Sequence, residues 1–247
     1  MSGDKALKKE INREAVGFKT MTSSIGKADY YTRWALGVFR RHLGGSLLEV
    51  GAGFANYRKF LTEIDRIVSI DIDEEVIEKA RAGDPDGNYV VADIAAPDFC
   101  ERIGGELFDA VLCCNVLEHI EHEEAAVRNI ERSLRSGGKA LLFLPAFGAL
   151  YNDLDRLAGH YRRYTLKSAL ALFDGGAMEA IGAEYFNPIG GLGWWANKFR
   201  RHDDIDSRNV NMQVMFFDRY VAPVSRALNP VTRGFFGQSV IIVGRKT

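Results

Sequence analysis

The sequence predicts an α/β fold, with a mainly parallel sheet and helices on both of its faces. From Ser46 onward, short apolar runs alternate with helical segments, and near-continuous apolar runs are typical of buried parallel strands. The first apolar run passes directly into a glycine pair, Gly51 and Gly53, as at the turn from a strand into a ligand-binding loop. The length of 247 residues suits one domain of this kind.

Residues 1–45 are predicted to form an N-terminal helical segment, and residues 46–247 the main domain. After a polar start, an amphipathic helix is expected to end at Gly44-Gly45. Its apolar residues recur at helical spacing: Tyr31, Trp34, Ala35, Val38, Phe39 and Leu43. We expect this helix to pack on the domain that follows.

Five apolar runs in the first part of the main domain are predicted strands. They are Ser46–Val50, Arg66–Ile70, Asn88–Ala92, Leu107–Cys114 and Lys139–Leu144. Helices are predicted over Phe54–Ile64, Asp73–Arg81 and Glu123–Leu134. Asp73 is a suitable N-cap for the second helix, and a Ser136-Gly137-Gly138 turn is expected to close the third.

The pattern changes after Pro145. Tyr151–Tyr164 is rich in charged and aromatic residues without clear periodicity, and Thr165 is predicted to cap a helix that ends near Gly175-Gly176. A strand is expected near Ala183–Phe186. The aromatic segment from about residue 190 to 237 is predicted to be a mostly helical cap, inserted before a last strand at Ser239–Gly244.

Composition excludes several classes of protein. The net charge of −1 and pI of about 6.5 do not indicate electrostatic capture of nucleic acid. No apolar run approaches the roughly 18 residues of a membrane span, and Met1–Glu10 lacks the apolar core of a secretory signal. Cys100, Cys113 and Cys114 are expected to be free thiols in a reducing compartment. We therefore expect a cytoplasmic protein.

The loop Glu49-Val50-Gly51-Ala52-Gly53 is the strongest candidate for a ligand site, because ligands of open α/β sheets bind beyond the carboxyl ends of the strands. Asp71 ends the second strand and is well placed for a ribose diol. A dinucleotide would require a third glycine where Asn56 stands, and the Glu49 carboxylate would repel its pyrophosphate. S-adenosylmethionine carries an ammonium group and no phosphate, so the loop favours this methyl donor over NAD.

Polar residues also follow the next two strands. Asp93 follows the third strand, where a carboxylate can accept the adenine amino proton, and Asn115 follows the fourth. Each alone is typical of a turn or cap. Polar residues at the ends of four successive strands are together better explained by a ligand site.

The motif series resembles that of class I S-adenosylmethionine-dependent methyltransferases over roughly residues 45 to 145. The matching motifs are Leu48-Glu49-Val50-Gly51-Ala52-Gly53, Ile70-Asp71-Ile72-Asp73, Ala92-Asp93-Ile94, Asn115-Val116-Leu117-Glu118-His119-Ile120 and Leu134-Arg135-Ser136-Gly137-Gly138. The resemblance implies a Rossmann-like seven-stranded sheet whose last strand is antiparallel. It implies that Glu49, Gly51, Ala52, Gly53 and Asn115 line the methionine part, Asp71 the ribose, and Asp93 and Ile94 the adenine. Ile72 and Val116 are further candidates for cofactor binding.

The second half resembles a narrower bacterial group that is often associated with glycosyltransferases. The shared features include Gly159-His160-Tyr161-Arg162-Arg163-Tyr164-Thr165 and Gly193-Trp194-Trp195. This resemblance implies a sugar or glycolipid acceptor in polysaccharide biosynthesis.

The acceptor side begins after the fifth strand, at the same edge of the sheet as the cofactor loop. An oxygen acceptor loses a proton when it is methylated, so a general base is useful. His160 and Asp155 are the candidates, with His119 third; His160 could equally be a structural hydrogen-bonding residue. Candidate acceptor-binding residues are Tyr151, Tyr161, Arg162, Arg163 and Trp194, although the arginines could instead pair with Asp153 and Asp155.

We expect no metal, because the spacing of Asp153, Asp155 and His160 matches no ordinary site. The working hypothesis is methyl transfer from S-adenosylmethionine to a hydroxyl of a glycan-related or other small molecule. N-methylation, an NAD-dependent oxidoreductase and a donor-binding subunit that supports a partner are the alternatives, and a homodimer is left open. Val214–Leu228 is expected to pack within the cap rather than to dock on a membrane surface.

Overall fold

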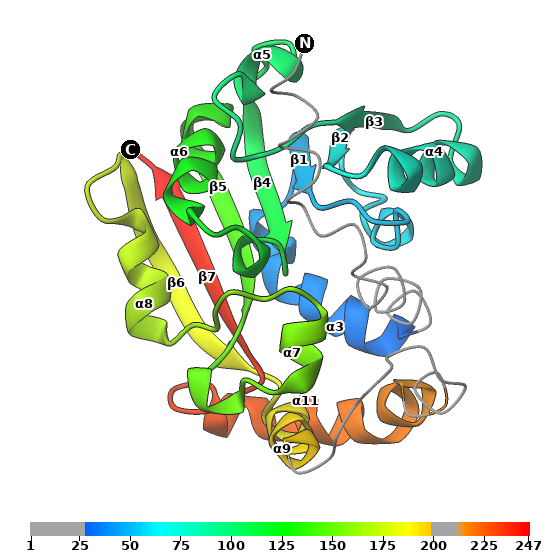
Figure 1. The fold of residues 1–247 in the computed structure, drawn as a ribbon, viewed down its shortest axis with the longest axis vertical. Helices are drawn as coiled ribbons and strands as arrows, with labels where there is room; N and C mark the ends of the chain where they lie inside the picture. The colour runs from blue at the N-terminus through cyan, green and yellow to red at the C-terminus, as the bar shows by residue number, and fades with distance from the viewer. Residues whose placement is uncertain (1–27, 199–211, 213) are drawn as a thin grey trace.

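The computed structural model describes residues 28–198, 212 and 214–247. Its strands are β1 (Ser46–Val50), β2 (Arg66–Asp71), β3 (Asn88–Val91), β4 (Phe108–Cys114), β5 (Leu134–Pro145), β6 (Met178–Phe186) and β7 (Ser239–Lys246). They form one seven-stranded sheet in the order β3-β2-β1-β4-β5-β7-β6 (Figure 1). The first five strands pair in parallel, and β7 is antiparallel to both of its neighbours, β5 and β6. The predicted fold class is confirmed.

The helices of the described chain connect these strands and cover the sheet. The longer ones are α3 (Asp29–Phe39), α4 (Glu74–Gly83), α6 (Glu123–Ser133), α9 (Pro188–Asn197) and α11 (Ala222–Thr232). Short ones are α5 (Phe99–Arg102), α7 (Asp153–Leu157), α8 (Leu166–Leu170), the 3-10 turns η1 (Arg40–His42), η2 (Arg58–Phe60), η3 (Leu117–His119), η4 (Gly148–Leu150) and η5 (Ala171–Phe173), and the π-helical turn η6 (Phe217–Val221).

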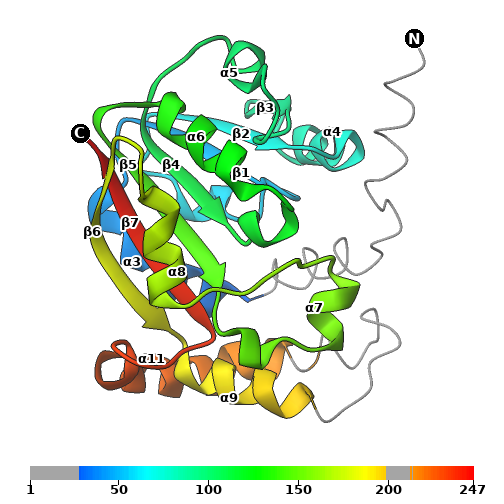
Figure 2. The same ribbon diagram turned by 60° about the vertical axis from the view of Figure 1, so that its left-hand side comes forward.

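Each face of the sheet has its own apolar core. On one face, α5, α6 and α8 bury Phe99, Ile130 and Ala169 against strand residues such as Val111 and Leu142. Figure 2 shows α6 and α8 on this face. Burial of a side chain as large as Phe99 or Ile130 stabilises a fold by roughly 1.5–3 kcal/mol, so these helices hold this face of the sheet.

The opposite face is covered by α3, the amphipathic helix predicted from the sequence. It buries Trp34 and Phe39 in a cluster with Leu47, Leu112 and Phe143. The first turn of α3 is capped from far along the chain, because the carboxylate of Asp218 accepts hydrogen bonds from the backbone N–H groups of Tyr30 and Tyr31, at 3.2 and 2.7 Å. The predicted residues 1–27 of the N-terminal segment lie outside the described part of the chain.

The predicted helix over Phe54–Ile64 is wrong. This segment consists of turns and η2, joined by i to i+3 hydrogen bonds such as Ala55 N–H to the Ala52 carbonyl (3.0 Å). Ala55 has φ +56°, a left-handed conformation that interrupts an α-helix. The helical periodicity of the segment instead places Tyr57, Phe60 and Ile64 against the α3 core.

Two strand boundaries also differ from prediction. β5 begins at Leu134, so the predicted turn at Ser136-Gly137-Gly138 lies inside the strand, at a register irregularity opposite Phe108 and Ala110. Gly137 has φ +77°, a left-handed conformation that is common in β-bulges and that glycine adopts more easily than other residues. β6 extends back to Met178, because β7 pairs with it over its whole length.

The segment between β6 and β7 contains α9, η6 and α11. The predicted packing of Val214–Leu228 within the cap is wrong for five residues, which stay exposed: Met215, Phe216, Tyr220, Val224 and Leu228. Among the residues that the structure describes, no helix is both long enough and apolar enough to cross a membrane.

Candidate active site

The loop after β1 turns sharply against the end of β2. The N–H groups of Gly51 and Ala52 both donate to the Ile70 carbonyl at 2.9 Å, and Gly53 N–H donates to the Asp71 carboxylate at 3.0 Å. Gly51 has φ +76°, and a Cβ there would lie 2.4 Å from a methyl group of Val116. The loop conformation therefore requires glycine at this position.

Glu49 carries a buried carboxylate beside this loop. Its side chain is 1% exposed, one oxygen accepts a hydrogen bond from Ser69 Oγ at 2.6 Å, and within the described chain the other oxygen has no partner. Burial raises the pKa of Glu49 to about 7, against the lowering effect of the Ser69 hydrogen bond. A cationic hydrogen-bond donor at the free oxygen would satisfy this group.

Asp71, the end of β2, ties the loop to α4. Its two oxygens accept hydrogen bonds from the backbone N–H groups of Gly53 and Asp73, and burial raises its pKa. Each carboxylate oxygen keeps a further lone pair for a hydroxyl donor. The neighbouring Ile72 is 48% exposed at the same strand end.

The ends of β3 and β4 present the remaining predicted cofactor residues. The carboxylate of Asp93 accepts the N–H of Ala95 at 2.8 Å, and Ile94 is buried in the core. Asn115 has φ +51°, and its N–H donates to the Phe143 carbonyl at 2.8 Å. This left-handed turn directs the chain from β4 into η3, and it sets Val116 against Gly51.

A second polar constellation centres on Asp155, which is fully buried in α7. Its carboxylate accepts hydrogen bonds from His160 Nδ1 (2.8 Å), Arg163 Nε (2.8 Å) and Trp194 Nε1 (3.1 Å). Burial alone would raise the pKa of Asp155, but the hydrogen bond from His160 and the charge of Arg163 hold it below its ordinary value. Asp155 is therefore an anionic anchor that holds three side chains from two segments.

His160 lies next to η3. Tyr161 N–H donates to the Glu118 carbonyl at 2.8 Å, which pins the loop after α7 to η3. The rings of His119 and His160 meet edge to face, with centroids 4.6 Å apart. Burial lowers the pKa of His119 to about 3, so this ring is neutral over the physiological range.

Residues 48–142 match the family model for a methyltransferase domain. This match covers β1 to β5 and every strand end described above. Over these residues the chain is a methyltransferase domain. No curated protein matches its sequence.

Solved structures share the fold of this methyltransferase at low sequence identity. One is similar to it at a TM-score of 0.57 and 16% identity, a SAM-dependent methyltransferase from Archaeoglobus fulgidus; 87% of this chain and 92% of that one are covered. A TehB-like SAM-dependent methyltransferase from Corynebacterium glutamicum has a TM-score of 0.53 and 16% identity, with 88% of each chain covered. The N-methyltransferase NodS from Bradyrhizobium japonicum, in complex with S-adenosyl-L-homocysteine, has a TM-score of 0.50 and 12% identity, with 98% and 97% covered.

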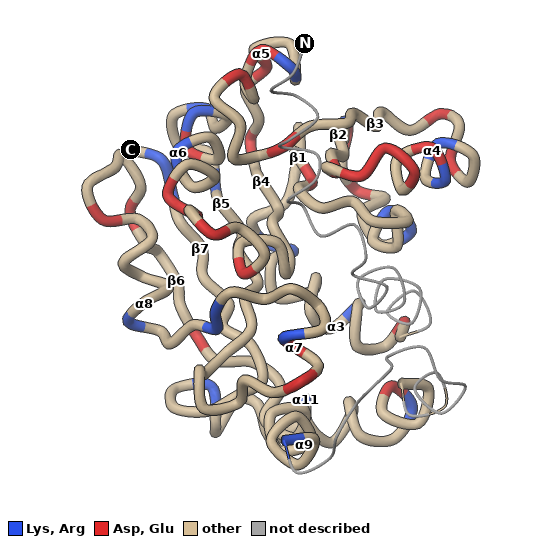
Figure 3. Tube along the Cα trace, in the orientation of Figure 1, with Lys and Arg blue, Asp and Glu red and all other residues tan. Residues whose placement is uncertain are grey.

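The methyltransferase lacks one feature that a dinucleotide site uses. A pyrophosphate binds at the N-terminus of the helix after the first glycine loop, and within the described residues no α-helix lies between β1 and β2. Acidic residues also gather around this edge, in the first turns of α4, α6 and α7 (Figure 3). Acidic side chains in a first turn interact favourably with the helix dipole.

The residues predicted to bind the acceptor differ in how far they are already bonded to other groups of the protein. Arg163 has a side chain only 2% exposed, and it bonds to Asp155 and to the Ala146 carbonyl. Arg162 pairs with Glu123 at 3.0 Å. Arg163 therefore pairs with Asp155, the alternative stated from the sequence, whereas Arg162 pairs with Glu123 and not with Asp153 or Asp155.

Of the aromatic candidates, two are bonded within the protein and one is exposed. Trp194 donates to Asp155 and lies under the Arg163 guanidinium, 5.1 Å from its ring centroid, and Tyr151 Oη donates to the His160 carbonyl at 2.7 Å. Both support the His160 loop. Tyr161 is 57% exposed next to them, with a ring that an acceptor could reach.

Sequence reasoning missed Glu118 of the methyltransferase. This residue is fully buried beside His119, and neither carboxylate oxygen has a side-chain partner in the described chain. Burial raises its pKa to about 8, partly offset by its own backbone N–H and by Arg163. Its place between Asn115 and His119 in the motif was a signal, but an acidic residue in a loop is usually exposed.

Proposed function

We propose that this methyltransferase transfers the methyl group of S-adenosylmethionine to a hydroxyl of a sugar, glycolipid or other glycan-related small molecule. The observation that supports this most directly is the Asp155–His160 pair beside η3. A carboxylate that holds Nδ1 of an imidazole leaves Nε2 as a proton acceptor. A hydroxyl acceptor needs such a group, whereas a neutral amine is already nucleophilic.

The reaction forms one C–O bond and breaks one C–S bond. The acceptor oxygen attacks the methyl carbon in line with the sulfonium sulfur, and the sulfur keeps the electron pair of the broken bond. The hydroxyl proton passes to His160, with Asp155 orienting the ring, and the product is the methyl ether with S-adenosylhomocysteine.

In this proposal the strand ends hold the donor. The free oxygen of Glu49 accepts the ammonium group, Asp71 accepts the ribose hydroxyls, and Asp93 accepts the adenine amino group. Gly51 and Gly53 let the backbone approach the methionine part, and Asn115 with Val116 closes its other side.

The glycan class of the acceptor is supported by the resemblance in residues 159–165 and by the exposed ring of Tyr161, because aromatic faces stack on sugars. We further propose that the protein acts in polysaccharide biosynthesis, lies in the cytoplasm and forms a homodimer.

The test is turnover against a panel of acceptors, following S-adenosylhomocysteine. Nucleotide sugars, lipid-linked sugars and their amino-sugar analogues form the panel. We expect His160→Ala to lower kcat on the best hydroxyl acceptor about 100-fold or more, while the donor Kd changes less than about 3-fold. His122→Ala, at the exposed start of α6, is the matched control and should keep native turnover.

Two results would overturn the proposal. Turnover confined to amines would make the protein an N-methyltransferase. Full turnover in both His160→Ala and Asp155→Asn would remove the base while leaving the donor site in place.

A further inference from the structure

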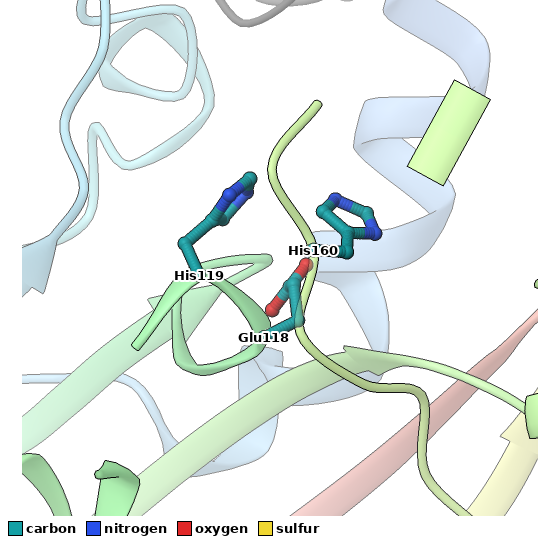
Figure 4. Close-up of side chains that lie close together, drawn as sticks. All are labelled: Glu118, His119 and His160. Atoms are coloured by element: carbon teal, nitrogen blue, oxygen red, sulfur yellow. The ribbon is translucent and has the colours of Figure 1, made fainter. Parts of the chain in front are cut away.

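Three side chains converge where η3 meets the loop after α7. Glu118 and His119 come from η3, and His160 comes from the loop (Figure 4). One ligand atom from each, a carboxylate oxygen and two imidazole nitrogens, lies within 4.8 Å of the other two. Ligands about 2.0–2.2 Å from a common ion lie roughly 3–4 Å apart, so small side-chain rotations would close this triangle around an ion.

Glu118 lacks the partners that a buried carboxylate needs. Its side chain is fully buried, and within the described residues neither oxygen accepts a hydrogen bond from another residue. Arg163, the cation whose charge lowers the pKa of Glu118, is already bonded to Asp155 and the Ala146 carbonyl. A buried acceptor without a donor is destabilising, and an ion among these three side chains would supply the missing partner.

The outer hydrogen bonds of the two imidazoles also match those of metal ligands. A histidine that binds a metal gives its other ring nitrogen to a carboxylate or a backbone carbonyl. His160 Nδ1 bonds to Asp155 at 2.8 Å, and the backbone of Ala158 and Gly159 acts on the ring of His119 to raise its pKa, against the effect of burial. Asp155 is itself fixed by Arg163 and Trp194, so His160 is held in one orientation.

We propose that Glu118, His119 and His160 bind one first-row divalent metal ion, such as Mn²⁺, Fe²⁺, Co²⁺ or Zn²⁺. Two imidazoles and one carboxylate suit these ions better than Mg²⁺ or Ca²⁺, which prefer sites made of oxygen. Three protein ligands leave coordination positions open for an oxygen of another molecule. The sequence predicts no metal from the spacing of Asp153, Asp155 and His160, and two of the three ligands proposed here lie outside that set.

A role for the ion in methyl transfer rests on the proposed function, whereas binding does not. A bound ion lowers the pKa of a coordinated hydroxyl, so an acceptor oxygen on the ion would lose its proton more easily. His160 would then act through the ion instead of taking the proton itself.

The test is metal binding by the full chain after treatment with a chelator, with the metal salt alone as probe. Calorimetry with Mn²⁺ and Zn²⁺ and the visible spectrum with Co²⁺ should give one ion per chain. Glu118→Gln, His119→Ala and His160→Ala should each weaken binding more than about 100-fold. Asp155→Asn leaves the three ligands in place but weakens the hold on His160, so it should reduce binding by about 10- to 100-fold.

His122→Ala is the matched control, because this exposed histidine lies close in sequence but outside the cluster. It should bind metal as the native chain does. No saturable binding of any of these ions, or binding that Glu118→Gln and His160→Ala leave intact, would overturn the proposal.

A second readout separates lost binding from lost folding. The metal should raise the Tm of the native chain and of His122→Ala. Glu118→Gln keeps the shape of the side chain and removes the carboxylate ligand, so the metal-free variant should unfold at or above the native Tm, and added metal should not shift it. An equal metal-induced shift in Glu118→Gln and the native chain would contradict the site. Donor binding, measured separately, shows whether the methyltransferase site is intact in either case.

Discussion

Glu49 shows how burial makes a single side chain sensitive to pH. Its pKa is about 7 in the folded chain and 4.5 in an exposed carboxyl. Because the folded state holds the proton more tightly, the contribution of Glu49 to stability is fully present below pH 4.5. It falls as the pH rises towards 7, where the buried group ionises. A cationic ligand reverses this preference, since it favours the ionised carboxylate.

We therefore predict that donor affinity rises with pH. S-adenosylhomocysteine, which has the same ammonium group, should bind about 10-fold more tightly at pH 7 than at pH 5.5, because Glu49 must release its proton. Glu49→Gln should weaken binding at pH 7 and flatten the profile. Calorimetry at several pH values measures both effects.

Glu63→Gln changes an exposed carboxylate that pairs with Arg40, and it should keep the native profile. A flat profile in the native chain would show that Glu49 does not meet the ammonium group.

The cofactor loop could be predicted from the sequence because its conformation requires a particular residue type. Gly51 has a left-handed φ and contacts Val116, so glycine is required there and is visible in the sequence. Glu118 could not be predicted as a site residue from the sequence. Its importance comes from the absence of neighbouring donors and from the approach of His160, and both depend on how η3 packs against the loop after α7.

Helices and strands also divide into those that the sequence predicts and those that depend on contacts with distant segments. Strand positions follow from apolar runs, and α3 and α4 follow from periodicity and from the Asp73 cap, whose side chain accepts the N–H groups of Glu75 and Val76. The segment Phe54–Ile64 has helical periodicity as well, but the turn that carries Ala55 into the left-handed region overrides it. The cap on α3 was also invisible, because Asp218 comes from a distant segment.

That distant cap leads to a prediction at the scale of the helix. Asp218→Ala removes the acceptor of two backbone N–H groups in the first turn of α3, and loss of such a cap costs about 1 kcal/mol. We expect a decrease of this size in the free energy of unfolding, measured by urea denaturation.

Asp65→Ala replaces an exposed aspartate that caps no helix, and its effect should stay within about 0.5 kcal/mol. Equal stabilities of Asp218→Ala and Asp65→Ala would show that the cap contributes nothing.

At the scale of the molecule, donor binding should stabilise the whole fold. The loop after β1, the end of β2 and the turn after β4 come from separate strands, and a ligand that contacts all three binds only the folded chain. At a concentration of 100 times its Kd, S-adenosylhomocysteine should add about 2.7 kcal/mol to the free energy of unfolding. For a domain of this size that is a rise in Tm of about 5 °C or more.

Gly51→Ala should lose this rise, because the new Cβ would meet Val116 at 2.4 Å and distort the loop. Gly83→Ala is the matched control, since a Cβ at Gly83 meets nothing within 4 Å. Differential scanning fluorimetry with and without the ligand compares the two variants. A native rise in Gly51→Ala would exclude this loop from the donor site.

The position of β7 between β5 and β6 also has a consequence for the order of folding during synthesis. β6 pairs only with β7 within the described sheet, yet it is translated before the helices α9 and α11 and before β7 itself. While the ribosome makes those later residues, β6 has no neighbour, and β5 has an open edge on the same side. Unpaired strand edges favour association with other chains, so the nascent protein is most exposed to aggregation in the interval between the synthesis of β6 and that of β7.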